Sequence, residues 1–167
     1  MIKKFRSYIC APSKGDYARG DNRPKVDCIL CSIAEGNPEV QQKIIYRNDE
    51  NMVVLNIYPY NPGHLLIFPI RHVEDFEELS EEEICSLFIL TQKSVKLLKE
   101  VYHPQGFNIG VNQGDAAGAS VKHFHIQVVP RYSSEIGFME TINGTRVVVE
   151  TLDETIKKLR SKANILE

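Results

Sequence analysis

The segment Lys-His-Phe-His-Ile-Gln-Val-Val at residues 122–129 alternates polar and apolar side chains, and this alternation constrains the fold more than any other feature. Successive side chains of a β-strand point to opposite faces of the sheet. His123, His125 and Gln127 therefore share one face, while the apolar residues between them share the face that must be buried. The sequence predicts a half-buried strand over residues 123–129 that presents two histidines and a glutamine side by side.

The rest of the chain supplies further strands and two helices. Apolar, β-branched runs at 53–57 and 64–70 predict two strands, and the two prolines and one glycine between them favour a turn. Apolar residues recur with helical spacing over 80–101, where Ser80 and Glu83 form a capping box. A strand at 107–111, a small polar loop before the histidine strand and a rather polar helix at about 152–162 complete the pattern. We expect an α+β domain with helices packed on an antiparallel sheet.

Length and composition predict a single domain. The 167 residues fit one domain of common size, assigned to 28–167 with a C-terminal helical tail, after an irregular arm at 1–27. The net charge of −2 argues against nucleic-acid binding. No apolar stretch reaches the length of a signal peptide or membrane span, so we expect a cytoplasmic protein that does not bind membranes. Cys10 and Cys85 are interpreted as ordinary thiols.

The two histidines of the predicted strand indicate two separate roles. Their side chains stand roughly 7 Å apart along a strand, which is too far for one metal ion to bind both at about 2 Å per bond. A neutral imidazole is a competent nucleophile toward phosphorus near neutral pH, and the phosphoramidate that it forms is labile enough to transfer its phosphorus-linked group to an acceptor. The alternative is a half-buried strand whose histidines only meet backbone carbonyls. The ordered set beside a glycine-containing loop favours the chemical interpretation.

Cys28-Ile-Leu-Cys31 is a second candidate site. Such a pair readily supplies two zinc ligands from one turn. A redox dithiol is the competing interpretation, although no βαβ context accompanies the pair.

The chain resembles the histidine-triad superfamily over residues 28–131. The matching positions, in order, are Asn56, Pro62-Gly63-His64-Leu65-Leu66-Ile67, Pro69, Arg71-His72-Val73, Asn112-Gln113-Gly114, Gly118, Ser120 and HFHIQVVPR. The stretch at 137–160 also looks like the tail of the diadenosine tetraphosphate phosphorylase-like branch. Gln127 stands where the superfamily pattern has its third histidine, and the transferase branches are similar in carrying glutamine there.

This resemblance implies a role for each matching residue. His125 takes the nucleotidyl group, and Gln127 orients it without titrating, which favours transfer to phosphate over transfer to water. Asn56 is expected to bind ribose hydroxyls. Ser120 and Asn112 are expected to bind phosphate oxygens, helped by backbone amides around Gly118. The full set assigned to nucleotide or phosphate binding is Asn56, His64, Asn112, Gly118 and Ser120, with His64 orienting its neighbours.

The resemblance also implies a structural zinc ion and a reaction. The zinc ligands are Cys28, Cys31, His72 and His123. The expected activity is that of a homodimeric nucleotidyltransferase, which splits an adenine dinucleoside polyphosphate with inorganic phosphate through a nucleotidyl-histidine intermediate. Two alternatives stay open: a hydrolase of dinucleoside polyphosphates or nucleoside phosphoramidates, and a catalytically silent nucleotide sensor.

Overall fold

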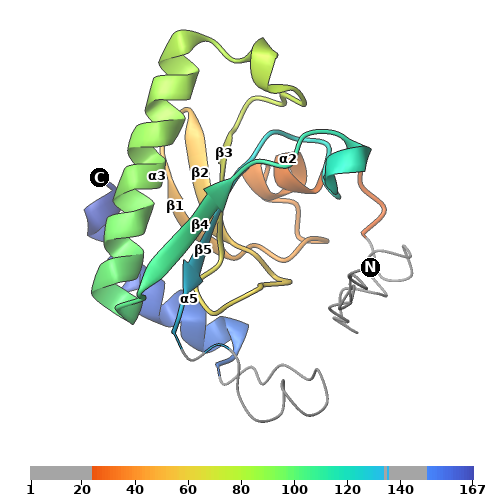
Figure 1. Ribbon diagram of the computed structural model, residues 1–167. Helices are drawn as coiled ribbons and strands as arrows, with labels where there is room; N and C mark the ends of the chain where they lie inside the picture. The colour runs from red at the N-terminus through yellow and green to blue at the C-terminus, as the bar shows by residue number, and fades with distance from the viewer. Residues whose placement is uncertain (1–23, 134, 136–149) are drawn as a thin grey trace, which may run out of the picture.

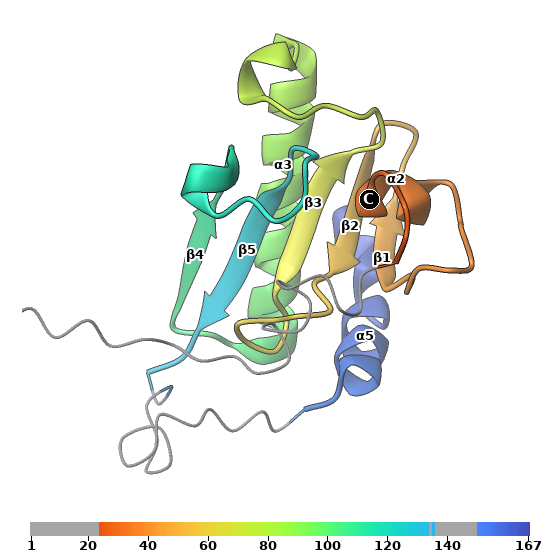
Figure 2. The same cartoon turned by 90° about the vertical axis from the view of Figure 1, so that its right-hand side faces the viewer.

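One antiparallel sheet organises the computed structural model, which describes residues 24–133, 135 and 150–167. Its strands are β1 (Ile44–Arg47), β2 (Asn51–Leu55), β3 (Leu65–Pro69), β4 (Gly106–Gly110) and β5 (Ile126–Arg131), in the spatial order β1-β2-β3-β5-β4. Helix α3 (Glu81–Tyr102) covers one face of the sheet and the short helix α2 (Ile29–Ala34) lies on the other (Figures 1 and 2). The predicted α+β class is confirmed.

The strand that follows the histidines begins later than predicted. β5 starts at Ile126, so His123 and His125 lie just before it. The pairing of β3 with β5 ends at Ile67 and Ile126, because β3 finishes at Pro69 and proline has no N–H for the ladder.

The alternation nevertheless continues through these residues. Phe124 is 3% exposed and lies in the core beneath α3, together with Ile126 and Val128. Its backbone N–H donates to the carbonyl of Val73 at 2.6 Å, which holds the segment without a ladder partner. The histidine side chains are therefore directed away from α3, as the sequence predicted.

The other predicted elements are present with shifted ends. The strands expected at 53–57, 64–70 and 107–111 correspond to β2, β3 and β4, displaced or shortened by one or two residues. The last helix, α5 (Leu152–Arg160), ends two residues before the predicted limit. β1 and α2 were not predicted.

Helix α3 has the start that its sequence indicates. The hydroxyl of Ser80 accepts the N–H of Glu83 at 3.2 Å, and the Glu83 carboxylate accepts the N–H of Ser80 at 2.9 Å. The helix stops at His103, which has a left-handed φ of 47° and precedes Pro104.

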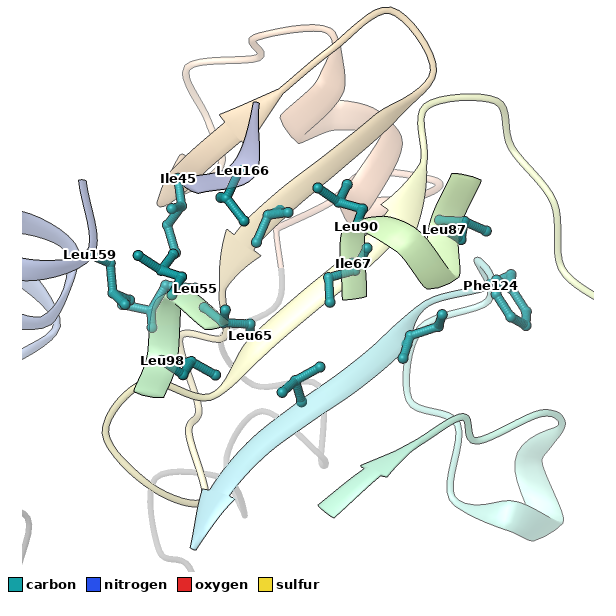
Figure 3. Close-up of a cluster of buried hydrophobic side chains, with 14 of the residues drawn as sticks. Ile45, Leu55, Leu65, Ile67, Leu87, Leu90, Leu98, Phe124, Leu159 and Leu166 are labelled. Atoms are coloured by element: carbon teal, nitrogen blue, oxygen red, sulfur yellow. The ribbon is translucent and has the colours of Figure 1, made fainter. Parts of the chain in front are cut away.

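The larger core lies between the sheet and α3, with the C-terminal elements at one side. Leu87, Leu90 and Leu98 of α3 face the sheet, and α5 and the 3-10 helix η3 (Ala163–Leu166) close one side with Leu159 and Leu166 (Figure 3). A smaller core on the opposite face packs α2 against the sheet. Its buried members are Leu30, Ile33, Ala34, Val40, Met52, Val54 and Phe68.

Some predictions fall on residues outside those described. These are residues 1–23 of the predicted arm at 1–27, including Cys10, and residues 137–149 of the predicted tail at 137–160. Within the described part of the chain, none of the helices has the length and apolar character needed to cross a membrane.

Candidate active site and metal centre

A cleft of about 350 Å³ opens on the α2 face of the sheet. Its apolar wall comes from Leu30 and Ile33 of α2 and from Val54 and Leu66 of the sheet. Six residues predicted from the sequence to act at the site also line it: Asn56, Asn112, Gly118, Ser120, His125 and Gln127. The fold thus brings together residues from the turn after β2, the loop before β5 and β5 itself.

The orientation of His125 determines which ring nitrogen can react. Its Nδ1 lies 2.7 Å from the backbone carbonyl oxygen of His123, so Nδ1 carries the proton and donates this hydrogen bond. In the neutral ring, Nε2 then holds the lone pair. Burial lowers the pKa of His125 below its ordinary value, and the hydrogen bond to His123 only partly offsets that effect. The side chain is therefore a neutral imidazole in the cleft, the form that a nucleophile requires.

Gln127 follows His125 by two residues and lines the same cleft. It sits in the middle of the sheet, opposite Leu66 of β3 and Gly110 of β4. This central position fixes its backbone from both sides. An amide group offers hydrogen bonds but does not titrate in the physiological range.

The loop between β4 and β5 contributes the polar wall. It contains the 3-10 helix η2 (Asp115–Ala117), which ends at Gly118 with a left-handed φ of 82°. The Gly118 N–H donates to the Asp115 carbonyl at 3.0 Å, and the Ala119 N–H to the Gly114 carbonyl at 3.3 Å. These two amides are engaged within the loop. The anion-binding role expected for the backbone amides around Gly118 stays a prediction. Gly118 contributes its backbone conformation, which presents Ser120 to the cleft.

Gln113 anchors this loop and was assigned no role from the sequence. Its side-chain oxygen accepts the N–H of Phe76 at 2.9 Å, and its amide donates to the Glu77 carboxylate at 3.1 Å. Both partners belong to the 3-10 helix η1 (Phe76–Glu78). The Gln113–Phe76 hydrogen bond joins residues 37 apart in sequence and anchors the loop next to Asn112, which lines the cleft.

His64 lies behind the cleft and is 0% exposed. Its Nδ1 is 3.2 Å from the side-chain nitrogen of Asn56 and accepts the N–H of Tyr60 at 3.2 Å, while the rings of His64 and Tyr60 stack at 5.2 Å. The Asn56 oxygen accepts the N–H of Tyr58 at 2.9 Å. His64 contacts Asn56 and Tyr60, which line the cleft, and is not itself among the lining residues. The role implied for it, orienting its neighbours, stays a prediction.

Two cysteines and two histidines form a separate cluster. The ligand atoms of Cys28, Cys31, His72 and His123 lie within 4.8 Å of one another. Measured pairs are 3.3 Å from Cys28 Sγ to His123 Nδ1, and 3.2 Å from Cys31 Sγ to His72 Nδ1. A tetrahedron with bonds of about 2.0–2.3 Å has edges of roughly 3.3–3.8 Å, so small movements complete a zinc site.

The surroundings of the two histidines suit metal binding. His123 Nε2 lies 2.9 Å from the carbonyl of Pro69, and therefore carries the proton and leaves the Nδ1 lone pair toward the sulfurs. His72 Nε2 lies 3.6 Å from a carboxylate oxygen of Glu74. Burial lowers the pKa of His123 to about 4, which keeps this imidazole neutral as a ligand must be.

The thiols favour the same conclusion. Burial, followed by the interaction with Cys28, raises the pKa of Cys31 to about 12, so a cation is needed to hold this sulfur as a thiolate. Cys28 also serves as the N-cap of α2, where its sulfur accepts the N–H of Cys31 at 3.5 Å. The cluster can hold a metal ion. Helix α2 carries Cys31 of this cluster and also lines the cleft with Leu30 and Ile33, so the cluster lies next to the cleft.

Known proteins share this arrangement of sequence and fold. Residues 37–134 match the sequence model of the HIT domain. The AP-4-A phosphorylase of Mycobacterium tuberculosis is 39% identical over 84% of this chain and 69% of its own length. An uncharacterized HIT-like protein of Methanocaldococcus jannaschii is 35% identical over 80% of this chain and 98% of its own.

A solved structure extends the similarity to three dimensions. A zinc-bound histidine triad family protein from Mycobacterium smegmatis has a TM-score of 0.69 and 27% identity to this chain. The match covers 84% of this chain and 95% of that one.

Proposed function

The chain belongs to the HIT domain family, and we propose that it is a nucleotidyltransferase that splits dinucleoside polyphosphates with inorganic phosphate. The observation that carries the proposal is the fixed tautomer of His125, whose Nε2 lone pair is available in the cleft because Nδ1 donates to the His123 carbonyl. The named relative from Mycobacterium tuberculosis supports the substrate class.

The reaction requires two displacements at one phosphorus atom. The Nε2 lone pair of His125 attacks the phosphorus next to one nucleoside, and the bond from that phosphorus to the bridging oxygen breaks. A nucleoside polyphosphate leaves with the bond electrons. An oxygen of inorganic phosphate then attacks the same phosphorus, the N–P bond breaks, and a nucleoside diphosphate and free imidazole result.

The residues around His125 have distinct tasks in this proposal. The apolar wall from α2 holds the base, and Asn56 binds the ribose hydroxyls. Ser120 and Asn112 donate hydrogen bonds to the phosphate oxygens, which carry more charge in the transition state. Gln127 holds the nucleotidyl group without supplying protons to water, which favours phosphate as the acceptor.

Zinc has a structural task in this proposal, with Cys28, Cys31, His72 and His123 as ligands. The ion would be bound by these four side chains and would fix the backbone of His123, whose carbonyl orients the His125 ring.

Intact-mass spectrometry tests the covalent step. After brief mixing with diadenosine tetraphosphate, the wild-type protein should gain the mass of one adenylyl group and lose it when phosphate is added. His125→Ala should form no adduct while still binding adenosine monophosphate. His103→Asn is the matched control, because it removes an exposed histidine and asparagine tolerates the left-handed backbone there.

The products distinguish the proposal from its alternatives. Adenosine diphosphate as the main product at saturating phosphate supports a transferase. Adenosine monophosphate alone under that condition identifies a hydrolase. Nucleotide binding without turnover or adduct identifies a sensor.

We also propose that the protein is a homodimer joined through β4. This strand is an edge of the sheet (Figure 2). Ile109 in the strand is 50% exposed, and Val111, just after it, is 39% exposed. The other edge, β1, is covered by α5, where Arg160 donates to the Ile44 carbonyl at 2.8 Å. Light scattering should give twice the chain mass of 19.0 kDa, and Ile109→Lys should shift the protein toward the monomer.

A further inference from the structure

A buried asparagine, Asn61, joins one wall of the cleft to the C-terminal end of β5. It belongs to the loop at 56–64, which connects β2 to β3 and lies beside that end of β5 in Figures 1 and 2. Four residues of this loop line the cleft: Asn56, Ile57, Tyr58 and Tyr60. Asn61 does not line it and is only 3% exposed. A buried polar side chain needs hydrogen-bond partners, and here these partners determine where the wall stands.

The amide nitrogen of Asn61 donates to two acceptors. Its Nδ2 lies 2.6 Å from the backbone carbonyl oxygen of Pro130 and 3.0 Å from a carboxylate oxygen of Glu135. Pro130 lies in β5, the strand that also carries Gln127. Because both partners are acceptors, the side chain at position 61 must supply two N–H donors from one atom. An asparagine amide does so, whereas an aspartate of the same size has no such donors when ionised.

Glu135 makes the second of these hydrogen bonds a charge-assisted one. Its carboxylate also accepts from Nε and Nη2 of Arg131, at 2.8 and 2.7 Å, and from the N–H of Tyr132 at 2.6 Å. The hydrogen bonds from Arg131, more than any other contact, lower the pKa of Glu135 to about 2, so this carboxyl is ionised at neutral pH. An ionised acceptor makes a stronger hydrogen bond than a neutral one. Asn61 is therefore held both by β5 and by a carboxylate fixed next to it.

The loop connects this attachment to the residue expected to bind ribose. The His64 N–H donates to the Asn61 carbonyl at 3.1 Å, and the Asn56 N–H donates to the His64 carbonyl at 2.9 Å. The side-chain nitrogen of Asn56 also lies 3.2 Å from Nδ1 of His64, which is fully buried. A displacement of Asn61 from β5 would therefore move Asn56 relative to the cleft.

We propose that Asn61 is a positioning residue for nucleoside binding, because its amide fastens the wall that carries Asn56 to β5. This inference rests on the proposed function, and it identifies a residue that acts on the ribose without touching it. The phosphate contacts come from a different element, the loop between β4 and β5 that contains Asn112 and Ser120. Loss of the Asn61 amide should weaken the contacts to the ribose hydroxyls and leave those to phosphate in place.

The test compares two ligands that differ only in the ribose hydroxyls. Adenosine monophosphate and its 2′,3′-dideoxy form are titrated into each protein in a calorimeter, and the ratio of their Kd values measures recognition of the hydroxyls. Asn61→Asp should lower the preference for adenosine monophosphate by about fivefold, the effect of one hydrogen bond. An unchanged ratio overturns the proposal. Equal affinities in wild type also overturn it, because no ribose contact would then need positioning.

Asn51→Asp is the matched control. Asn51 is 2% exposed and lies at the other end of β2, where its Nδ2 donates to Ser86 Oγ at 2.5 Å. The substitution places a carboxylate in an equally buried polar position, so it should lower Tm. It should leave the ratio of Kd values unchanged. An equal fall of the ratio in Asn51→Asp and Asn61→Asp would assign the effect to a general loss of stability and contradict the positioning role.

A double-mutant cycle tests the route from Asn61 to the ribose. If Asn61 acts through Asn56, Asn61→Asp should have no further effect on the ratio in an Asn56→Ala protein. An effect as large as that in wild type contradicts this route. Glu135→Ala is the second variant in case Asn61→Asp does not fold, because Asn61 then keeps its bond to Pro130. It should lower the ratio by a smaller factor, and no change in the ratio counts against the proposal.

The binding ratio distinguishes failure of this inference from failure of the proposed function, because it requires no turnover. If wild type forms the adenylyl adduct and Asn61→Asp keeps the ratio of wild type, the positioning role is wrong and the transferase proposal stands. If wild type binds adenosine monophosphate but forms no adduct, the transferase proposal is wrong. The ratio measured for Asn61→Asp then still decides whether this residue positions the ribose wall.

Discussion

Replacing Cys28 by serine distinguishes the contribution of the metal to stability from that of the α2 N-cap. Cys28 is both a candidate zinc ligand and the N-cap of α2. Serine is a preferred N-cap residue and keeps that hydrogen bond, but it lacks the thiolate that zinc prefers. Any large loss of stability in Cys28→Ser therefore reports the metal and not the helix cap.

The size of the effect follows from linkage. A ligand that binds only the native state, present at a thousand times its Kd, stabilises that state by about 4.1 kcal/mol. For a domain of this length, each kcal/mol shifts Tm by about 2–4 °C. Cys28→Ser should therefore melt about 8–16 °C below the zinc-loaded wild type. Cys28→Ala also loses the cap, worth about 1 kcal/mol, and should melt about 2–4 °C lower still.

Calorimetry with metal analysis measures this prediction. Wild type, Cys28→Ser and Cys28→Ala are melted in reductant, before and after removal of zinc by a chelator, and the zinc content of each sample is determined. Chelation should bring wild type down to the Tm of Cys28→Ser. Cys85→Ser removes an exposed thiol outside the cluster and serves as the control. Equal Tm values for loaded and chelated wild type, or a Cys28–Cys31 disulfide without metal, would refute the zinc assignment.

Four further substitutions, the last of them a control, test other parts of the structure. Gln127→His places a titratable group beside His125 and should shift the products toward nucleoside monophosphate. The rate should also become more pH-dependent between about pH 5 and 8. Chromatography of the products over this pH range measures both effects. Gln113→Ala releases the loop from η1 and should raise KM about threefold to tenfold with little change in kcat, because two hydrogen bonds that position Asn112 are lost; an equal fall in kcat would contradict a positioning role. Gly63→Ala should cost about 2–4 kcal/mol in urea unfolding, since its φ is 82° and a Cβ would lie 2.9 Å from Leu98 Cδ2. Gly36→Ala has a φ of 76° with nothing within 4 Å of the added Cβ, so it should show only the backbone part of about 1 kcal/mol.

Local patterns in the sequence were sufficient for much of the fold. The capping box of α3 involves residues three apart, and the alternation around His125 involves neighbours, so both are readable without tertiary contacts. Helix α2 was missed because six residues span less than two turns, too few to show a helical period. The apolar Leu30 and Ile33 beside the cysteines were the available signal.

The tertiary structure decided how the candidate residues combine. Only the packed chain brings Cys31 within 3.5 Å of His123 Nδ1 across 92 residues, and uses the same helix to line the nucleotide cleft. The start of β5 depends on its partner strand, because Pro69 ends the ladder from the other side of the sheet. The sequence alone determined which residues have reactive side chains. Which nitrogen of His125 can react was decided by the fold, which places the His123 carbonyl 2.7 Å from Nδ1. A hydrogen bond depends on distance and direction, and residue spacing in the sequence specifies neither.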